Sequence, residues 1–345
     1  MRFINNMSFS SIVIKKIIPL IVRIIGGKKD TWKEEKYSTA ILSLIMIPLK
    51  RLKGIRRNPK FVENQYDELS GLYIRDNYYQ STMRYSIVDS KVKKISSIDN
   101  MREIRKEIRN VLSNYEFKSV LEVGVGELTT IEDVYKFFGP DIDCYGVDLS
   151  LNRIKHGLEE YKKRHDKLPI VSKANALHLP FPDNSFDLVI TRHTLEQMPK
   201  IYKEALKEIF RVSKKQVILF EPSFELGTFA QKLKMLNTDY VRGIPKFLNS
   251  HNDLKVEKEY LMKNSANPLN HTACFRISTL NQENMTNSNS AIPFVCPISK
   301  SRLDDKGTYL YSKDSKRVYP VIEGIPVLDP EYSLILSESI DLSKQ

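Results

Sequence analysis

The chain has 345 residues, 41% hydrophobic and 28% charged, so it can bury a substantial core and is not a disordered, collagen-like or coiled-coil protein. This length predicts two domains, or one domain with extensions, and three scattered cysteines exclude a disulfide framework or a multi-cysteine zinc site. The net charge of +12 is confined, because residues 1–60 hold 14 Lys or Arg against three Asp or Glu, which leaves 40 basic and 39 acidic residues elsewhere. That imbalance excludes a nucleic-acid protein that is basic throughout, and it predicts one localised contact with an anionic partner.

Residues 1–60, called the basic head here, are amphipathic. Their two apolar runs, 11–25 and 40–49, are interrupted by Lys, Arg or Pro, and the second leads directly into KRLKGIRR. An apolar helix of about ten residues spans about 15 Å, half of a hydrocarbon core, so neither run predicts a membrane-spanning helix. Two interpretations stay open: a segment lying on an anionic membrane surface, or a helical cap packed on the body. The first predicts a cytoplasmic protein attached peripherally to the inner face of the membrane.

Residues 61–98 are expected to form a helical lid or linker. Within them Tyr73, Tyr78 and Tyr79 either cover a binding site or pack in an ordinary way. The pattern changes at residue 99, where apolar residues begin to recur at helical spacing. Asp99 is of a type favoured at helix N-caps, so it is expected to start that helix.

Short apolar runs alternate with helical patterns along residues 99–280. Strands are predicted at 119–123, 143–148, 169–174, 186–191 and 216–221. Between them, Ser150 is expected to cap one helix and Pro199 to stand in the first turn of another. The alternation predicts an α/β fold, a Rossmann-like doubly wound sheet that is mostly parallel, preceded by an N-terminal helical extension. The stretches 254–261 and 273–280 are expected to close the sheet as a hairpin that brings in one antiparallel strand.

Residue types suited to ligand binding stand at the ends of four predicted strands. They are Glu122, Gly124 and Gly126 in EVGVG, then Asp148, then Asn175 with Ala176, and finally Thr191 with His193. The carboxyl ends of parallel strands meet at one edge of the sheet, where open α/β folds bind their ligands. Glycines let the backbone approach a ligand closely, and a carboxylate at Asp148 suits the two hydroxyls of a ribose. Each residue also has a structural interpretation, such as a tight turn or a helix cap.

Four segments, VLEVGVGELTT, CYGVDLS, ANALHLPFPDNSFDLVI and TRHTLEQMPK, make residues 99–280 resemble the class I S-adenosylmethionine-dependent methyltransferases of the methyltransferase type 11 kind. The resemblance implies S-adenosylmethionine as cofactor. The implied cofactor-binding residues are Glu122, Gly124, Gly126, Asp148, Leu149, Asn175, Ala176 and Thr191. The glycines and Glu122 would meet its methionine part, Asp148 its ribose, and Asn175 and Ala176 its adenine. Two positions depart from the family pattern: Leu128 replaces a frequent glycine, and Asn175 stands where an aspartate is common.

Methyl transfer from a sulfonium needs mainly an acceptor aligned for in-line attack, with a general base where that acceptor is a hydroxyl. His193 and Glu196, one helical turn apart after the fourth strand, are the candidate catalytic residues. The alternative for His193 is ordinary packing at the start of a helix. The other histidines show no metal-ligand spacing, so no metal site is expected.

The C-terminal part reads as a separate small module. Residues 281–290 are predicted as a polar linker, 291–330 as a β-rich domain and 331–345 as a tail. Through CPISK and YPVIEGIPVL, the domain resembles the small zinc-ribbon-like family that includes the tRNA-methyltransferase activator subunit. Only Cys296 stands at a cysteine position of that family, and Ser299 replaces the second, so bound zinc is not expected. The resemblance implies a module that stabilises or activates a methyltransferase, docked in cis. The alternative is a β-module without such a role.

The leading hypothesis is an S-adenosylmethionine-dependent methyltransferase acting on a small molecule, a glycan or a lipid-linked acceptor near a membrane. A near-neutral body offers no long positive track for RNA, which disfavours nucleic acid as a partner. Two alternatives stay open. The first is a tRNA or translation-factor methyltransferase, which the C-terminal resemblance suggests. The second is a catalytically degenerate scaffold that binds the cofactor without turnover.

Overall fold

The computed structural model describes residues 58–71, 82–280 and 291–336, together with scattered positions between 32 and 50. Most of the basic head, the three tyrosines of the predicted lid, the predicted linker 281–290 and residues 337–345 lie outside the described residues. Within the part of the chain that is described, no helix is both long enough and apolar enough to cross a membrane.

Seven strands of the described residues form the central sheet, in the spatial order β5-β4-β3-β6-β7-β9-β8. They are β3 (Ser119–Val123), β4 (Asp143–Asp148), β5 (Ile170–Lys173), β6 (Phe186–Arg192), β7 (Ser213–Pro222), β8 (Leu254–Leu261) and β9 (Thr272–Thr279). Strands β3 to β7 are parallel, whereas β9 is antiparallel to both β7 and β8. The predicted doubly wound sheet with one antiparallel strand is confirmed, and the predicted hairpin supplies that strand. The strand order reverses between β3 and β6, which is where such sheets bind ligands.

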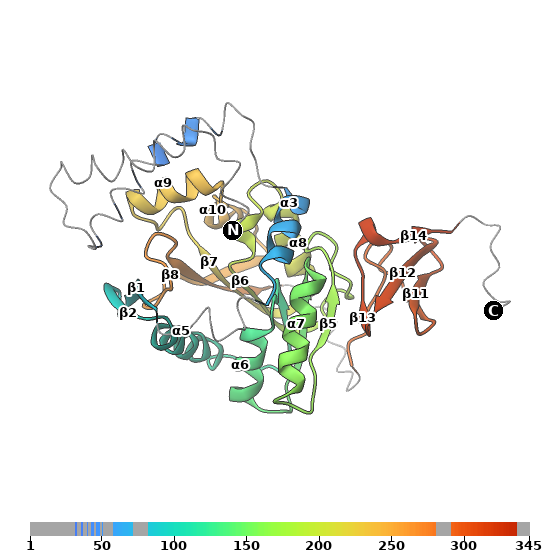
Figure 1. The fold of residues 1–345 in the computed structure, drawn as a ribbon. Coiled ribbons are helices and arrows are strands. Elements are labelled where there is room, and N and C mark those ends of the chain that lie inside the picture. Colours follow the sequence, from blue (N-terminus) through green and yellow to red (C-terminus); the bar gives the residue numbers. More distant parts are fainter. Residues whose placement is uncertain are drawn as a thin grey trace.

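Helices cover both faces of the sheet (Figure 1). They are α5 (Ser97–Leu112), α6 (Thr129–Phe138), α7 (Leu151–Lys162), α8 (Tyr202–Val212), α9 (Phe229–Thr238) and α10 (Ile244–Asn249), with a short 3-10 turn, η2 (Leu195–Gln197), after β6. Val120 of β3 packs among residues of α5, α6 and α7, while the next residue, Leu121, packs among residues of α8 and α10. Because both faces are covered, the parallel strands are apolar at nearly every position, which explains why their sequences read as short continuous hydrophobic runs.

Two predicted helix starts are shifted in the structure. Helix α5 has Ser96 as its N-cap, and the Ser96 hydroxyl accepts the backbone N–H of Asp99, so Asp99 lies in the first turn instead of at the cap. An acidic residue is equally favourable there because of the helix dipole. Pro199 precedes α8 and is not part of its first turn. Helix α7 begins after Ser150 as predicted, and the Ser150 hydroxyl accepts a backbone N–H from the first turn.

The segment predicted as a helical lid or linker, 61–98, is only partly helical. It holds most of α3 (Pro59–Glu68), but also an antiparallel hairpin of β1 (Met83–Val88) and β2 (Lys91–Ser96). The two turn residues of this hairpin, Asp89 and Ser90, have φ values of 50° and 62°. Two-residue hairpin turns need such positive φ values and usually contain glycine. The prediction was wrong for this hairpin because its turn has no glycine to announce it.

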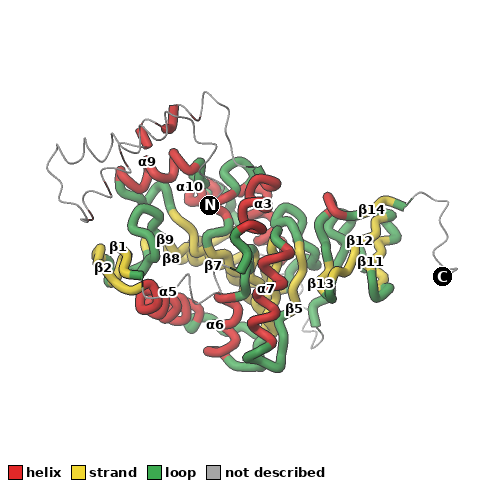
Figure 2. The backbone as a smooth tube through the Cα atoms, viewed as in Figure 1, coloured by secondary structure: helices red, strands yellow, loops and turns green. Residues whose placement is uncertain are grey.

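The C-terminal residues form a small antiparallel β-module beside the β5 edge of the central sheet (Figure 1). Figure 2 shows that it consists almost entirely of strands and loops. Its elements are β10 (Asp304–Asp305), β11 (Tyr309–Ser312), β12 (Arg317–Ile322), β13 (Ile325–Pro326), η3 (Pro330–Tyr332) and β14 (Leu334–Ile335). Its core is formed by Cys296, Leu303, Leu310, Tyr319 and Leu328. The predicted small C-terminal β-rich domain is therefore present.

The C-terminal module contacts both the edge of the central sheet and helix α8. The Leu328 N–H donates to the Lys173 carbonyl of β5 at 2.8 Å. Lys300 pairs with Glu208 of α8 at 2.8 Å. Because β5 is the outermost strand on this side, the bond to Lys173 satisfies a carbonyl at an otherwise unpaired sheet edge.

Candidate functional site

A cavity of about 520 Å³ lies at the carboxyl ends of β3, β4 and β6, beside the point where the strand order reverses. Seven of the ten site residues predicted from the sequence line it: Glu122, Gly124, Asp148, Leu149, Ala176, His193 and Glu196. Helix α3 and the loop between β8 and β9 supply further lining residues. The strand-end argument therefore located the cavity, although Gly126, Asn175 and Thr191 are not among its lining residues.

The two glycines after β3 are required by the backbone and by close neighbours. Gly124 has φ +81°, and a Cβ added to it would lie 2.1 Å from Thr194 Oγ1. Gly126 has φ +52°, and its added Cβ would lie 2.3 Å from the Arg153 guanidinium. A larger residue at Gly124 would therefore be both strained and obstructed, whereas at Gly126 it would chiefly be strained, because the end of the Arg153 side chain can move. Gly126 contributes its backbone N–H, which donates to Asp148, and does not line the cavity.

Leu128, which stands where the family often has glycine, keeps the glycine conformation. Its φ of 61° places it in the left-handed region at the N-cap of α6, while its side chain is only 1% exposed. Space for that side chain comes from Gly157 in α7, because a Cβ added to Gly157 would lie 2.3 Å from Leu128 Cδ1. The loop therefore has a left-handed residue at Leu128 without a glycine, and a glycine in the neighbouring helix α7 makes room for the leucine side chain.

Asp148, at the end of β4, accepts hydrogen bonds with both carboxylate oxygens. Oδ2 accepts the Gly126 N–H at 2.8 Å and Oδ1 accepts the Ser150 N–H at 2.9 Å. Arg153 Nη1 lies 3.8 Å from Oδ2, and its guanidinium packs over the ring of Tyr66 from α3 at 4.9 Å. The carboxylate is thus oriented along the cavity wall and joined to the glycine bend.

Glu122 is the most unusual group in the cavity wall. Its side chain ends at the carboxyl end of β3, is 2% exposed, and leaves Oε2 without a hydrogen-bond partner. Desolvation raises the pKa of Glu122 to about 8, although the positive charge of Arg192 opposes that change. A buried carboxyl oxygen without a partner is costly, so this site favours a ligand that brings a positively charged hydrogen-bond donor.

Of the two predicted site residues after β5, one lines the cavity and the other stabilises the turn that contains it. Ala176 lines the cavity, as does Leu149 from the loop after β4. Asn175 does not, because its side-chain Oδ1 accepts the Leu177 N–H at 3.1 Å and so closes the turn. This asparagine acts as a local turn residue, a common use of that side chain.

His193 and Glu196 are in direct contact, as their spacing suggested. His193 Nδ1 lies 3.0 Å from Glu196 Oε2, and Nε2 lies 2.9 Å from Thr272 Oγ1 of β9. Asn270 donates to the same oxygen of Glu196 at 2.9 Å. Desolvation lowers the pKa of His193, but the carboxylates of Glu196 and Glu221 outweigh it, so the pKa lies above its ordinary value of 6.5. An imidazole oriented by a carboxylate in a cavity wall can accept or donate a proton.

Glu221, at the end of β7, is a residue that sequence reasoning missed. It is fully buried beneath the loop after β6, where its carboxyl accepts from Thr191 Oγ1 at 2.7 Å and from the backbone N–H groups of Thr194 and Glu196. Burial raises the pKa of Glu221 to about 7. Thr191, predicted beside the cofactor, points to Glu221 and not into the cavity. An acid ending the apolar run QVILFE was the available signal.

No group of three or more His, Cys, Asp or Glu side chains among the described residues is arranged to hold a metal ion. The polar side chains that line the cavity carry carboxylates, guanidinium groups, hydroxyls, amides and one imidazole.

Known proteins are similar to the part of the chain that forms the cavity wall after β3, β4 and β6. Residues 121–220 match the family described as a methyltransferase domain. Over 110 residues the chain is 34% identical to the demethylmenaquinone methyltransferases of Anoxybacillus flavithermus and Geobacillus stearothermophilus, covering 32% of this chain and 46% and 47% of those proteins. The chain thus spans about half the length of these relatives.

Solved structures with similar folds include magnesium protoporphyrin IX methyltransferase from Synechocystis PCC 6803 with bound SAM. It is 12% identical, with a TM-score of 0.46, and the match covers 65% of this chain and 98% of that one. An S-adenosylmethionine-dependent methyltransferase from Aquifex aeolicus is 16% identical, with a TM-score of 0.40, covering 52% and 97%. Residues 121–220 are thus similar to the methyltransferase-domain family that the motifs of this segment indicated.

Proposed function

We propose that this protein transfers a methyl group from S-adenosylmethionine to a small-molecule acceptor. The observation that carries the proposal is the unpaired, buried Oε2 of Glu122 at the glycine bend after β3. The methionine part of the cofactor ends in an ammonium group, the kind of donor that this oxygen lacks. The hydrogen-bond acceptors of the cavity therefore fit this cofactor.

Three groups of residues would hold the cofactor. Glu122 and the backbone at Gly124 would receive the methionine part, and Asp148 would accept from the ribose hydroxyls. Ala176 and Leu149 would supply apolar contact to the adenine, since both line the cavity. When bound, the sulfonium supplies an activated methyl group, so the protein needs chiefly to align an acceptor with it.

The acceptor would lie beside His193, at the end of the cavity that the loop between β8 and β9 closes. The Glu196 carboxylate holds His193 Nδ1, which leaves Nε2 to exchange its contact with Thr272 for one with an acceptor hydroxyl. In that position His193 would remove the hydroxyl proton as methyl transfer occurs. The relatives named above are demethylmenaquinone methyltransferases, which supports a small-molecule acceptor.

We also propose that the acceptor is a glycan or a lipid-linked molecule that the protein methylates at a membrane surface. It depends on the basic head, most of which lies outside the described residues. Co-sedimentation with liposomes tests it: binding that requires anionic lipid and is lost on deleting residues 1–57 supports it, whereas equal binding to neutral liposomes contradicts the electrostatic part.

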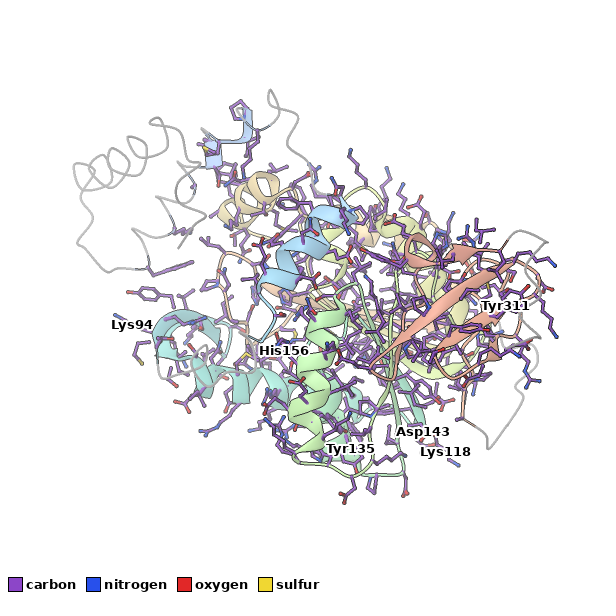
Figure 3. All side chains as sticks on the ribbon, turned by 45° about the vertical axis from the view of Figure 1, so that its right-hand side comes forward. Lys94, Lys118, Tyr135, Asp143, His156 and Tyr311 are labelled. Carbon is purple, nitrogen blue, oxygen red and sulfur yellow. The ribbon has the colours of Figure 1, made fainter. Side chains whose placement is uncertain are left out.

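Calorimetric titration with S-adenosylmethionine tests the proposal directly. We expect binding by the full chain and at least a tenfold loss in Asp148→Asn, because a charged hydrogen-bond acceptor is worth about 1.5–3 kcal/mol. Asp143→Asn is the matched control, since Asp143 is exposed at the other end of the same strand (Figure 3). Incubation with methyl-labelled donor and cell extract then identifies the acceptor class. Absence of cofactor binding by the unaltered chain would overturn the proposal.

A further inference from the structure

We infer that Tyr332 of the C-terminal module is a positioning residue for the cofactor site, acting through Glu63 of α3 and Lys173 of β5. The inference rests on the proposed function, because it concerns the same cavity. It assigns the module a task within this chain: to fix two walls of the cavity in place.

The three residues form a compact cluster that joins distant parts of the chain. The Tyr332 hydroxyl donates to Glu63 Oε1 at 2.7 Å, and the Lys173 ammonium donates to the same oxygen at 2.7 Å. The ammonium also lies over the ring of Tyr332, 4.3 Å from its centre. Lys60 completes the cluster by donating to both Tyr332 and Glu63. Helix α3, strand β5 and the C-terminal module therefore meet at one carboxylate.

This cluster touches the cavity at two places. Glu63 itself lines it, as do its neighbours Val62 and Tyr66 on α3. On the other side, the Lys173 ammonium donates to the backbone carbonyl of Leu149, which follows Asp148 in the cavity wall. The Lys173 side chain is thus bonded to the loop that directly follows the candidate ribose contact, Asp148.

Two side chains of the cluster are buried and two are exposed. Those of Lys173 and Glu63 are 5% and 9% exposed, so each depends strongly on its partners, whereas Lys60 and Tyr332 lie at the surface. Tyr332 contributes both a hydroxyl for Glu63 and an aromatic face for the ammonium. The module is anchored at the same strand position, because Leu328 donates its N–H to the Lys173 carbonyl. Removing the tyrosine side chain would take one partner each from Glu63 and Lys173 and so loosen the attachment of α3 and the Leu149 loop, while leaving the module bonded to β5.

Calorimetric titration with S-adenosylhomocysteine on full-length variants tests this inference. We expect Tyr332→Ala to weaken binding about tenfold and Tyr332→Phe, which keeps the ring over Lys173 but loses the hydrogen bond to Glu63, to weaken it about threefold, because Tyr332 acts on the cofactor only through other residues. The matched control is Tyr311→Ala, a tyrosine of the same module that lies on β11 away from α3 (Figure 3). Its affinity should be unchanged.

Hydrogen exchange separates positioning from general stabilisation. In Tyr332→Ala, amides of α3 should exchange faster while those of the module strands β11 and β12 keep their protection. Unchanged affinity in Tyr332→Ala, or equal losses in Tyr332→Ala and Tyr311→Ala, would overturn the inference. Failure of the unaltered chain to bind would instead overturn the proposed function, so the two failures are distinguishable.

Discussion

Replacing Glu122 by glutamine gives the sharpest test of the cofactor site, because the raised pKa of this buried carboxyl sets the sign of the effect and its approximate size. The pKa of Glu122 is raised to about 8 by burial. At pH 7 about nine carboxyls in ten are therefore protonated in the ligand-free protein. An incoming ammonium favours the charged carboxylate, so binding should expel close to one proton from Glu122.

Calorimetry in buffers of different ionisation enthalpy measures that proton directly. The unaltered chain should release about 0.9 proton per bound cofactor at pH 7, and its binding constant should rise almost tenfold per pH unit until the carboxyl is ionised or the ammonium itself titrates. Glu122→Gln should bind more weakly and release none. Glu116→Gln, an exposed residue in the turn before β3, is the control and should behave like the unaltered chain. Proton release that persists in Glu122→Gln would refute the reasoning.

The same substitution has a second consequence, of opposite sign, for stability. The folded pKa of Glu122 lies above its ordinary value of 4.5, so the folded chain binds more protons than the unfolded one and loses stability as pH rises from 4.5 towards 8. Keeping the group neutral at pH 7 costs about 3 kcal/mol on this basis. Without ligand, Glu122→Gln should therefore gain stability relative to the unaltered chain between pH 4.5 and 7, measured by urea unfolding. A difference that does not change with pH would contradict the raised pKa.

Four further predictions concern the acceptor side and the glycine bend. His193→Gln should lower kcat by about a hundredfold or more if the acceptor is a hydroxyl, with little change in cofactor affinity; an unchanged kcat would assign His193 to packing. Glu221→Gln should move the acidic limb of the pH–rate profile to lower pH, because the Glu221 carboxylate helps to raise the pKa of His193 and the base must be neutral to act; an unmoved limb would contradict this. Leu128→Gly should destabilise the fold by about 2–4 kcal/mol in urea unfolding, since the lost burial exceeds the roughly 1 kcal/mol of relieved left-handed strain. Gly157→Ala should cost less in a Leu128→Ala background than alone, and equal costs would show that the two residues do not compete for space.

The sheet could be predicted from the sequence because its parallel strands are buried on both faces, so runs such as those of β3 and β4 carry their own signal. The position of the cavity could be predicted because a doubly wound sheet brings the carboxyl ends of its parallel strands together. The hydrogen-bond partners of the residues at those strand ends could not be predicted from the sequence. Thr191 faces Glu221 across neighbouring strands, and only the lateral order of β6 and β7 brings them together. The hairpin of β1 and β2 was missed for a local reason, its glycine-free turn.

The two halves of the cavity differ in how completely the carboxyl and imidazole groups of Glu122, His193 and Glu221 are hydrogen-bonded before any ligand binds. On the acceptor side, His193 has a left-handed φ of 54°. The loop that follows it is held in place because the backbone N–H groups of Thr194 and Glu196 donate to Glu221. On the cofactor side, Glu122 keeps an unpaired buried oxygen. Binding therefore changes the energetics mainly around Glu122, whereas the surroundings of His193 are already arranged. Substitutions near Glu122 should thus alter the cofactor affinity and the number of protons released on binding. Those near Glu221 should alter kcat and its pH profile. A variant that changed both the affinity and the kcat profile would show that the two halves of the cavity are coupled.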